Sequence, residues 1–328
     1  MKKLKLFATV LSLAVVLSGC ATTNETAKKS SDPRPSVILP FTGTDYTPLP
    51  AGTDGTAGKN ASYVLFGDWP QTIKADSVTV DETKSVMMGD FTYYKGSDGA
   101  WYAKCIEKAF ESGYKYSDGT DVAQESANST KYFKVEPIKW RVLTNDYNGK
   151  KLLLAENILA AHRYAASSNN YKDSEIREWL NGTFLGAAFT STAQNQIATT
   201  NVDNSADSTT DNENNLDKAT SYACENTSDK IFLLSEQEVT NSDYGFTAYA
   251  AYGTGNSRIR MTTDWSKAGG AYQSAGYYGY YGGWWWLRSP SYLSSSSARG
   301  VYIFATADYS ISVDSRGAGV VPALSIMN

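Results

Sequence analysis

Short apolar runs bounded by turn-forming residues recur along the chain after residue 60. The first run, at residues 63–66, predicts a strand that ends at the glycine and proline that follow it. Two further runs, at residues 138–143 and 152–154, flank an Asn-Gly pair at residues 148–149. Because Asn-Gly favours the two-residue turns that join antiparallel strands, this segment predicts a β-hairpin.

Capping residues predict two short helices. Ser174 precedes a single apolar stripe that Gly182 closes, which is the pattern of a capped amphipathic helix. Residues 231–234 form an apolar run typical of a strand, and the next residue, Ser235, stands three positions before Glu238. This Ser-x-x-Glu spacing resembles a capping box and predicts that a second helix begins there.

The last part of the chain contains three runs of strand type, at residues 301–304, 309–313 and 320–326. Scattered short strands with a few helices indicate an irregular α+β fold. No second core is evident in the pattern, so we expect one domain over residues 61–328.

The composition limits the chemistry that the chain can carry. Its 328 residues are 41% hydrophobic, which is enough for a large folded domain. One His and three Cys are too few for zinc, haem or iron–sulfur sites, so we expect no metal and no cofactor. The formal charge of −4 provides no basic field for a nucleic-acid backbone, so we expect no nucleic-acid partner.

The N-terminus has the organisation of a secretion signal. Three lysines precede an apolar run at residues 6–17, which is too short to span a bilayer stably. The run ends in Leu-Ser-Gly-Cys, so residues 1–19 resemble a bacterial lipoprotein signal with Cys20 as the lipidated first residue. The alternative is an ordinary signal peptide that is cut elsewhere. Residues 20–60 are rich in Thr, Ser, Pro, Gly and Lys and predict a flexible tether.

The remaining His and Cys residues show no catalytic arrangement. Cys105 and Cys224 are an even pair in a chain that leaves the cytoplasm, so either a disulfide joins them or both are buried free thiols. His162 has no acid at helical spacing and is interpreted as a surface or hydrogen-bonding residue. The sequence contains no nucleophile elbow, Walker loop or dinucleotide-binding glycine motif, and we expect no enzyme.

The C-terminal tail is unusual in composition. Residues 268–327 contain no Lys, Glu, Asn, His or Cys and are rich in Tyr, Ser, Gly and Ala. This combination is typical of antibody paratopes, in which Tyr supplies contact area while Ser and Gly adapt around it. The alternative is that the aromatic residues form the core of a β-rich domain. We favour the core for the tryptophans at 285–286 and exposure for Tyr302, Phe304 and Tyr309.

Codon chemistry gives the missing residue types a further interpretation. When only the adenines of an Asn codon are replaced, the products include Tyr, Ser, Asp, Gly, Ala, Phe and Arg but never Lys, Glu, Gln, Met or Trp. Residues 287–326 contain only types that such replacement permits. The composition therefore suggests adenine-directed variation of the tail, with the tryptophans at 284–286 as fixed scaffold.

Two motifs carry a resemblance to a known family. Residues 285–290 read Trp-Trp-Leu-Arg-Ser-Pro, and residues 319–324 read Gly-Val-Val-Pro-Ala-Leu. With these motifs the sequence resembles the variable lipoproteins, known from spirochaetes, that diversity-generating retroelements diversify. The resemblance implies a C-type lectin-like fold of the formylglycine-generating-enzyme subtype over residues 61–328, with a variable region at about 284–328. It extends to residues 66–71, 137–143, 177–181 and 232–235.

The chain departs from the related proteins in two respects. Val321 stands where related domains usually have Arg, so whatever that Arg contacts is absent. The formylglycine-generating enzymes use cysteines in their C-terminal part, and this tail has none. Their catalysis therefore does not carry over, and the resemblance implies binding by a rigid scaffold with a variable face.

Roles for the tail residues follow from the codon pattern and the resemblance together. Trp285, Trp286 and Arg288 are expected to be scaffold, with Arg288 paired to backbone carbonyls or to an acid. The candidate diversified, solvent-facing, ligand-binding positions are Tyr292, Ser294, Ser296, Gly300, Tyr302, Phe304, Ala307, Tyr309, Ser312, Asp314 and Arg316.

The strand predicted at residues 301–304 also predicts which way its side chains point. Side chains alternate between the two faces of a strand. Tyr302 and Phe304 should therefore share one face, while Val301 and Ile303 point to the other.

These features lead to one main expectation and two alternatives. We expect a lipoprotein held in the outer membrane by acyl chains such as palmitate at Cys20 and exposed at the cell surface. Its variable tail would bind a macromolecular ligand, with a protein favoured, and would not catalyse a reaction. One alternative is an extracytoplasmic carbohydrate-binding module or glycan-active enzyme, whose carboxylates would converge from distant segments. The other is a structural envelope lipoprotein whose aromatic residues are all core.

Overall fold

The computed structural model of the chain describes residues 39–41, 62–209, 222–246, 256–274, 276 and 282–327. Over these residues the fold mixes many short strands with a few short helices, so the expected irregular α+β class is confirmed. The expected lipoprotein signal and Cys20 lie outside the described residues.

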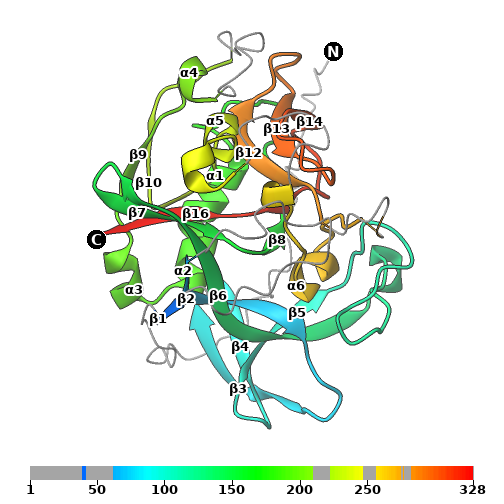
Figure 1. The fold of residues 1–328 in the computed structure, drawn as a ribbon. Helices are drawn as coiled ribbons and strands as arrows, with labels where there is room; N and C mark the ends of the chain where they lie inside the picture. Colours follow the sequence, from blue (N-terminus) through cyan, green and yellow to red (C-terminus); the bar gives the residue numbers. More distant parts are fainter. Residues whose placement is uncertain are drawn as a thin grey trace, which may run out of the picture.

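The larger of the sheets has nine strands, which are β1 (Leu39–Phe41), β2 (Ser62–Ile73), β3 (Val80–Met88), β4 (Phe91–Gly96), β5 (Trp101–Ile106), β6 (Thr130–Tyr147), β7 (Lys150–Ala155), β11 (Ile231–Phe232) and β16 (Ala323–Met327). Its main path runs in the order β11-β16-β7-β6-β5-β4-β3, while β2 pairs with β1 and β6. β3, β4 and β5 lie at the bottom of Figure 1, and β16 (red) crosses the middle. Strands from both ends of the described chain therefore share one sheet.

β2 is longer than the sequence pattern predicts. The expected end at Gly67 and Pro70 is wrong, because the strand continues past both residues opposite β6. The register between β2 and β6 shifts near each of them, as it does at a β-bulge. Gly67 has a positive φ of 68°, which glycine adopts without strain.

The segment expected to be only a tether contains β1. This short strand pairs antiparallel with β2, so the expectation of a flexible tether over residues 20–60 is wrong at residues 39–41. The physical reason is that one edge of β2 would otherwise expose unpaired backbone groups, and a neighbouring apolar segment covers them.

The hairpin predicted around Asn148 and Gly149 is confirmed. β6 and β7 pair antiparallel up to the position where Tyr147 faces Lys150. Asn148 and Gly149 have positive φ angles of 55° and 76°, the conformation in which an Asn-Gly turn matches the twist of its strands.

The smaller sheet carries the tail and has five strands, which are β8 (Ala160–Ala161), β12 (Trp285–Pro290), β13 (Ser297–Val301), β14 (Tyr309–Ser312) and β15 (Gly319–Val320). Their order is β14-β13-β12-β15-β8. In Figure 1, β12, β13 and β14 (orange) lie at the upper right. A separate pair is formed by β9 (Thr200–Val202) and β10 (Thr227–Asp229).

The predicted strand at residues 301–304 is wrong, because β13 ends at Val301 and the chain turns. The N–H of Tyr302 donates to Thr306 O and the N–H of Ala305 donates to Tyr302 O, each at 2.9 Å. The run at 309–313 corresponds to β14, and the run at 320–326 is divided between β15 and β16.

The helices are short and lie between strands. They are α1 (Glu175–Trp179), the π-helical turn η3 (Leu180–Phe184), α2 (Leu185–Ala188), α3 (Ser191–Gln196), α4 (Ala206–Thr209), α5 (Glu236–Val239) and α6 (Asp264–Ala268), with 3-10 turns η2 (Glu125–Ala127), η5 (Ser242–Tyr244) and η6 (Asn256–Arg258). The predicted cap is confirmed, since the Ser174 hydroxyl accepts a hydrogen bond from Arg177 N at 3.3 Å. The predicted stop at Gly182 is wrong, because η3 carries the chain on into α2.

Trp69 on β2 lies at the centre of the aromatic core. Its ring centroid is 5.1 Å from that of Phe91, 4.8 Å from Phe184 and 6.3 Å from Trp265. These rings come from β2, β4, η3 and α6, so one apolar core joins the two halves of the chain.

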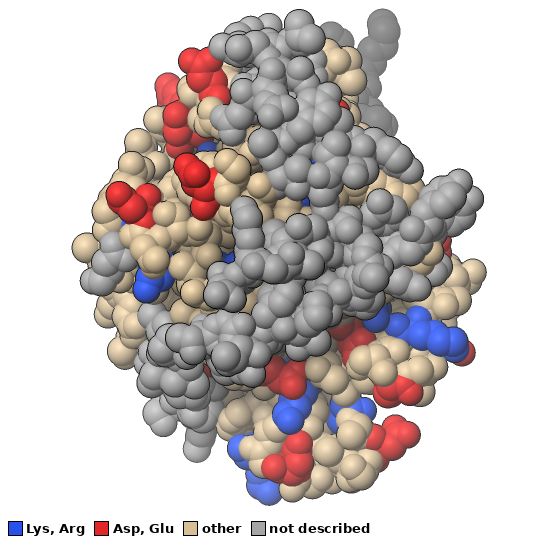
Figure 2. All heavy atoms as spheres, viewed as in Figure 1, with Lys and Arg blue, Asp and Glu red and all other residues tan. Residues whose placement is uncertain are grey.

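The surface shows both charged and apolar features. Charges of both signs are interspersed at the β3–β5 end of the face in Figure 2, while acidic side chains predominate at its upper left. Exposed apolar side chains include Tyr292, Leu293 and Tyr309 from the tail and Phe110 from the β5–β6 connection. Within the described residues, no helix has the length and apolar character needed to cross a membrane.

Candidate ligand-binding surface

The tail begins with a strand that is buried on both faces. Every residue of β12 is buried, and Trp285 and Trp286 are fully so. Each indole N–H donates to a backbone carbonyl, Trp285 to Arg258 O at 3.1 Å and Trp286 to His162 O at 2.8 Å. Both side chains therefore fix β12 to the rest of the domain, as expected of scaffold residues.

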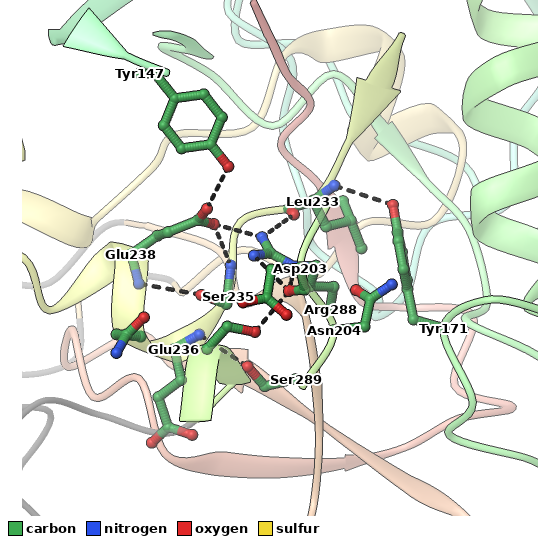
Figure 3. A network of polar contacts seen from close by, with 12 residues as sticks. Tyr147, Tyr171, Asp203, Asn204, Leu233, Ser235, Glu236, Glu238, Arg288 and Ser289 are labelled. Atoms are coloured by element: carbon green, nitrogen blue, oxygen red, sulfur yellow. Dashed lines mark hydrogen bonds and ion pairs between the residues drawn. The ribbon is translucent and has the colours of Figure 1, made fainter. Parts of the chain in front are cut away.

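Arg288 on β12 is buried and fully engaged in a polar network (Figure 3). Its guanidinium donates to Leu233 O at 2.9 Å, to Asp203 O at 3.2 Å and to the carboxylate of Glu238. Burial alone would lower the pKa of Arg288, but the Glu238 carboxylate holds it above its usual range. The expected pairing to backbone carbonyls or to an acid is confirmed on both counts.

The acid that pairs with Arg288 also caps α5. The Ser235 hydroxyl accepts from Glu238 N at 3.1 Å, and the Glu238 carboxylate accepts from Ser235 N at 2.8 Å. The predicted capping box is therefore confirmed. Two residues before Glu238 on α5, Glu236 forms a buried ion pair with Arg299 of β13 at 3.4 Å. Two tail arginines are thus tied to one short helix, which fixes the β12–β13 unit.

A strained turn follows β13 and presents two aromatic side chains. Ala305 has a φ of 64°, which side chains other than glycine rarely adopt. The buried Arg258 donates from Nε to Ala305 O at 2.6 Å and from its terminal nitrogen to Val239 O at 3.1 Å. Burial lowers the pKa of Arg258 to about 10. This anchored turn directs Tyr302 and Phe304 outward.

The predicted alternation around this turn holds, although the segment is not a strand. Tyr302 and Phe304 are half-buried, whereas Val301 and Ile303 are 0% and 4% exposed. The turn hydrogen bonds, rather than strand pleating, produce the alternation.

Tyr302, Phe304 and Tyr309 belong to a continuous group of rings. Tyr302 stacks on Tyr309 with ring centroids 4.3 Å apart, and it contacts Phe304 at 5.5 Å. Trp284 lies 5.9 Å from Tyr302 and 6.1 Å from Tyr309. Two rings from outside the predicted variable region continue the group. We call aromatic surface the side chains of Phe110, Tyr272, Trp284, Tyr302, Phe304 and Tyr309.

Phe110 and Tyr272 close the other side of the aromatic surface. The Tyr272 ring centroid lies 4.7 Å from that of Trp284, and Phe110 lies 5.4 Å from Tyr272 and 5.9 Å from Trp284. The Trp284 indole N–H donates to Gly317 O at 2.9 Å, which fixes the central ring. The rings are therefore ordered by one another before any ligand arrives.

A cleft of about 420 Å³ opens beside the aromatic surface. Three of its walls are rings of the surface, and a fourth ring, Tyr114, accepts a hydrogen bond from Gln273 N at 3.1 Å. Burial raises the pKa of Tyr302, with a smaller contribution from Tyr309. The lining residues are Glu111, Tyr114, Tyr272, Gln273, Ser274, Tyr302, Ile303 and Phe304.

Ser294, Ser296 and Ser312 lie at the opposite end of β13, whereas Arg316 precedes Gly317, which adjoins Phe110 of the aromatic surface. Gly300 faces Tyr309 at one end of the β13–β14 ladder, while Ser297 faces Ser312 at the other. Asn169 organises this far end, since its side-chain amide donates to Ser294 O at 3.0 Å and to Ser297 O at 2.9 Å. The candidates therefore form two groups.

The structure places the eleven candidate positions unequally. Gly300 and Ala307 are buried, so their assignment as solvent-facing positions is wrong. A side-chain carbon on Gly300 would stand 2.4 Å from Ile311 Cδ1 and 2.8 Å from Trp285 O. Nine candidates retain an exposed or half-buried position, namely Tyr292, Ser294, Ser296, Tyr302, Phe304, Tyr309, Ser312, Asp314 and Arg316.

Of the two alternatives for Cys105 and Cys224, a disulfide between them is not formed, because Cys224 is a free thiol. Cys105 is buried on β5 in the larger sheet, whereas Cys224 lies beside Tyr171 and Lys172, ahead of α1. Burial raises the pKa of the Cys224 thiol. The two residues belong to different parts of the fold. An even number of cysteines in the sequence does not show whether two of them lie close together.

His162 is a hydrogen-bonding residue. Its Nδ1 lies 2.6 Å from Arg163 O, and its ring packs against Trp179 with centroids 5.2 Å apart. Burial lowers the pKa of His162. Among the residues that the structure describes, no three His, Cys, Asp or Glu side chains group as a metal site.

The chain belongs to the family described as a domain of unknown function, DUF6273, whose model matches residues 148–328. The matched segment contains β12 to β16, α5 and Tyr272, and so most of the aromatic surface. No curated protein and no solved structure matches the chain.

Sequence reasoning missed the parts of the site that lie outside the tail strands. Phe110 and Tyr114 come from the β5–β6 connection, and Tyr272 follows α6. Arg258 and Arg299, which hold the turn and β13, were missed as well. A charged residue within an otherwise apolar stretch, as Arg299 is between Ala298 and Gly300, is a signal that could have indicated a buried ion pair.

Proposed function

We propose that this chain is a surface-displayed, lipid-anchored binding protein whose C-terminal tail recognises a macromolecular ligand, a protein in particular. In this proposal Cys20 carries the acyl chains, the outer membrane holds the protein, and the chain performs no catalysis. The observation that carries the proposal is the aromatic surface, where half-buried tail side chains and the exposed Tyr309 gather on a buried scaffold.

The physical support comes from the order already present in the rings. Binding normally costs side-chain entropy when flexible groups are immobilised. Tyr302 and Tyr309 are already stacked on each other, and the central Trp284 is hydrogen-bonded to the backbone. Aromatic pairs contribute about 0.5–1.5 kcal/mol each beyond the area they bury. Rings ordered in this way favour tight, specific contact with a partner surface.

We further propose that a retroelement diversifies the tail on a C-type lectin-like fold of the formylglycine-generating-enzyme subtype. The support comes from the burial pattern of the tail. Exposed positions such as Tyr309 and Ser312, whose residue types can arise from an Asn codon, alternate with buried scaffold residues. The irregular architecture, with short strands in three sheets, is compatible with that fold. A neighbouring reverse-transcriptase gene with an adenine-rich near copy of the tail coding sequence is the genomic observation that checks this part.

The binding proposal is tested by probing arrays of secreted proteins and of glycans with the full chain. The matched variant is the triple substitution Tyr302→Ser, Phe304→Ser and Tyr309→Ser, which introduces a residue type that the tail already uses. The control is Met327→Ser, which removes an exposed apolar side chain from β16. Protein signals that the triple variant loses and the control keeps support the proposal.

Other outcomes separate the alternatives. Glycan signals that survive the triple substitution favour a carbohydrate-binding module or a glycan-active enzyme. Absence of any signal that depends on the aromatic surface contradicts the proposal and favours a structural lipoprotein. Both variants must unfold within a few degrees of the parent, since the substituted side chains are exposed or half-buried.

A further inference from the structure

We infer that the cleft beside the aromatic surface accepts a cationic side chain, lysine or arginine, of the protein partner. Glu111 supplies the counter-charge, and the rings of Tyr114, Tyr272 and Tyr302 surround the cation. This inference rests on the proposed binding function and specifies the chemistry of its ligand.

The charge of the cleft is the first observation. Of the described residues that line it, Glu111 carries the one carboxyl group, and none of them is a lysine or an arginine. Glu111 is exposed, and its carboxylate makes no hydrogen bond or ion pair with any residue that the structure describes. Its negative charge is therefore available to a ligand.

The position of Glu111 relative to the rings is the second observation. After burial, the Glu111 charge is among the causes that raise the pKa of Tyr114 and the pKa of Tyr272. The carboxylate thus acts on the same two rings that wall the cleft. The charge of Lys108 is attracted by Glu125 and repelled by Arg316.

The rings themselves favour a cation. The face of an aromatic ring carries partial negative charge and attracts an ammonium or guanidinium group within about 6 Å of its centroid. A cleft walled by phenol rings and carrying one carboxylate therefore attracts positive charge in two ways, and it repels an anion. Gln273 and Ser274 add polar atoms at the wall that can accept hydrogen bonds from a guanidinium.

The size of the cleft agrees with one side chain. Its volume of about 420 Å³ is near the lower end of the range for small-molecule sites, which is about 300–1,000 Å³. A single lysine or arginine that projects from a partner surface can enter it, while the rest of the partner rests on the aromatic surface. An arginine anchor of this kind is common among residues that dominate binding energy.

The test measures binding of two defined probes to the full chain by ligand-observed NMR and calorimetry. The probes are N-acetyl-arginine amide and N-acetyl-citrulline amide, which have similar shape but differ in charge. We expect the arginine probe to bind at least about fivefold more tightly than the citrulline probe, with an affinity that falls as salt is added. Glu111→Gln should weaken binding of the arginine probe about fivefold and remove most of its salt dependence.

The matched control is Glu178→Gln, the same chemical change at an exposed position on α1 outside the cleft. It should leave arginine binding unchanged, while Tyr302→Ala should weaken it. Equal binding of the two probes, no binding of either, or an unchanged affinity in Glu111→Gln would overturn the inference. The proposed function survives that result when array signals still depend on Tyr302, Phe304 and Tyr309, so the two failures can be told apart.

Discussion

The substitution Gly300→Ala tests whether the fold limits which positions can change in the variable tail that we propose. Gly300 lies on β13, and an added side-chain carbon would meet Ile311 Cδ1 at 2.4 Å and Trp285 O at 2.8 Å. Real contacts of such a carbon are never so short. The Ile311 methyl group can rotate away. The Trp285 carbonyl is part of the β12 backbone, and moving it would disturb the pairing of β12 with β13.

The expected size of the effect follows from overpacking. Inserting a methyl group into a closely packed site costs about 1–3 kcal/mol. For a domain of this length each kcal/mol lowers the melting temperature by about 2–4 °C, so a loss near 2 kcal/mol lowers it by about 4–8 °C. The matched control is Gly182→Ala in η3, where nothing lies within 4 Å of the added carbon. That control should stabilise the protein by about 0.4–1 kcal/mol, because alanine restricts the unfolded chain.

Differential scanning calorimetry of the two variants and the parent provides the comparison. Opposite signs of the temperature shift are expected from the same chemical change at the two glycines. A Gly300→Ala protein that melts within about 1 °C of the parent would refute the predicted overpacking. It would mean that the site around Gly300 can accept a methyl group despite the short distances to Ile311 and Trp285. In that case Gly300 would return to the set of replaceable tail positions.

Three further predictions concern the scaffold. Arg288→Met should lower the free energy of unfolding by about 3–5 kcal/mol in a urea titration, because Glu238 is left buried without its partner, and adding Glu238→Gln should recover part of the loss. Burial lowers the pKa of His162 below its usual 6.5, so the folded protein keeps the ring neutral while the unfolded chain binds a proton near pH 6.5. This contribution is fully present above pH 6.5 and is lost as the pH falls toward the folded pKa. The melting temperature should therefore drop more in the parent than in His162→Gln between about pH 7 and 5, and parallel curves would contradict the assignment. Cys224→Ser should leave the melting temperature unchanged with or without reductant, and a drop seen only without reductant would indicate a disulfide at this thiol.

Features decided by neighbours in sequence could be predicted without the structure. The Asn148–Gly149 hairpin, the Ser174 cap and the Ser235–Glu238 capping box each depend on residues within four positions of one another. Their geometry is fixed by backbone dihedrals and by short hydrogen bonds, which the local residue types determine.

The residues that make up the aromatic surface could not be predicted in the same way, because they depend on contacts between distant parts of the chain. Phe110 and Tyr272 contact Trp284 but come from segments outside the tail, and no sequence pattern in the tail predicts these contacts. The codon argument indicates which residue types a position can take, but it does not indicate whether that position is buried. For that reason the exposed Tyr309 and the buried Gly300, which face each other across the β13–β14 ladder, could not be told apart from sequence.

The place of β16 in the larger sheet has a consequence for how the protein is made. β16 (Ala323–Met327) runs between β11 and β7, so it pairs with two strands that are synthesised before it. The larger sheet cannot close between β11 and β7 until the chain has been synthesised through β16. A premature stop before residue 323 removes β16 and leaves the edges of β7 and β11 that face it unpaired. Such a truncated product would expose unpaired strand edges, which favour aggregation, so correct closure of the larger sheet depends on translation through β16.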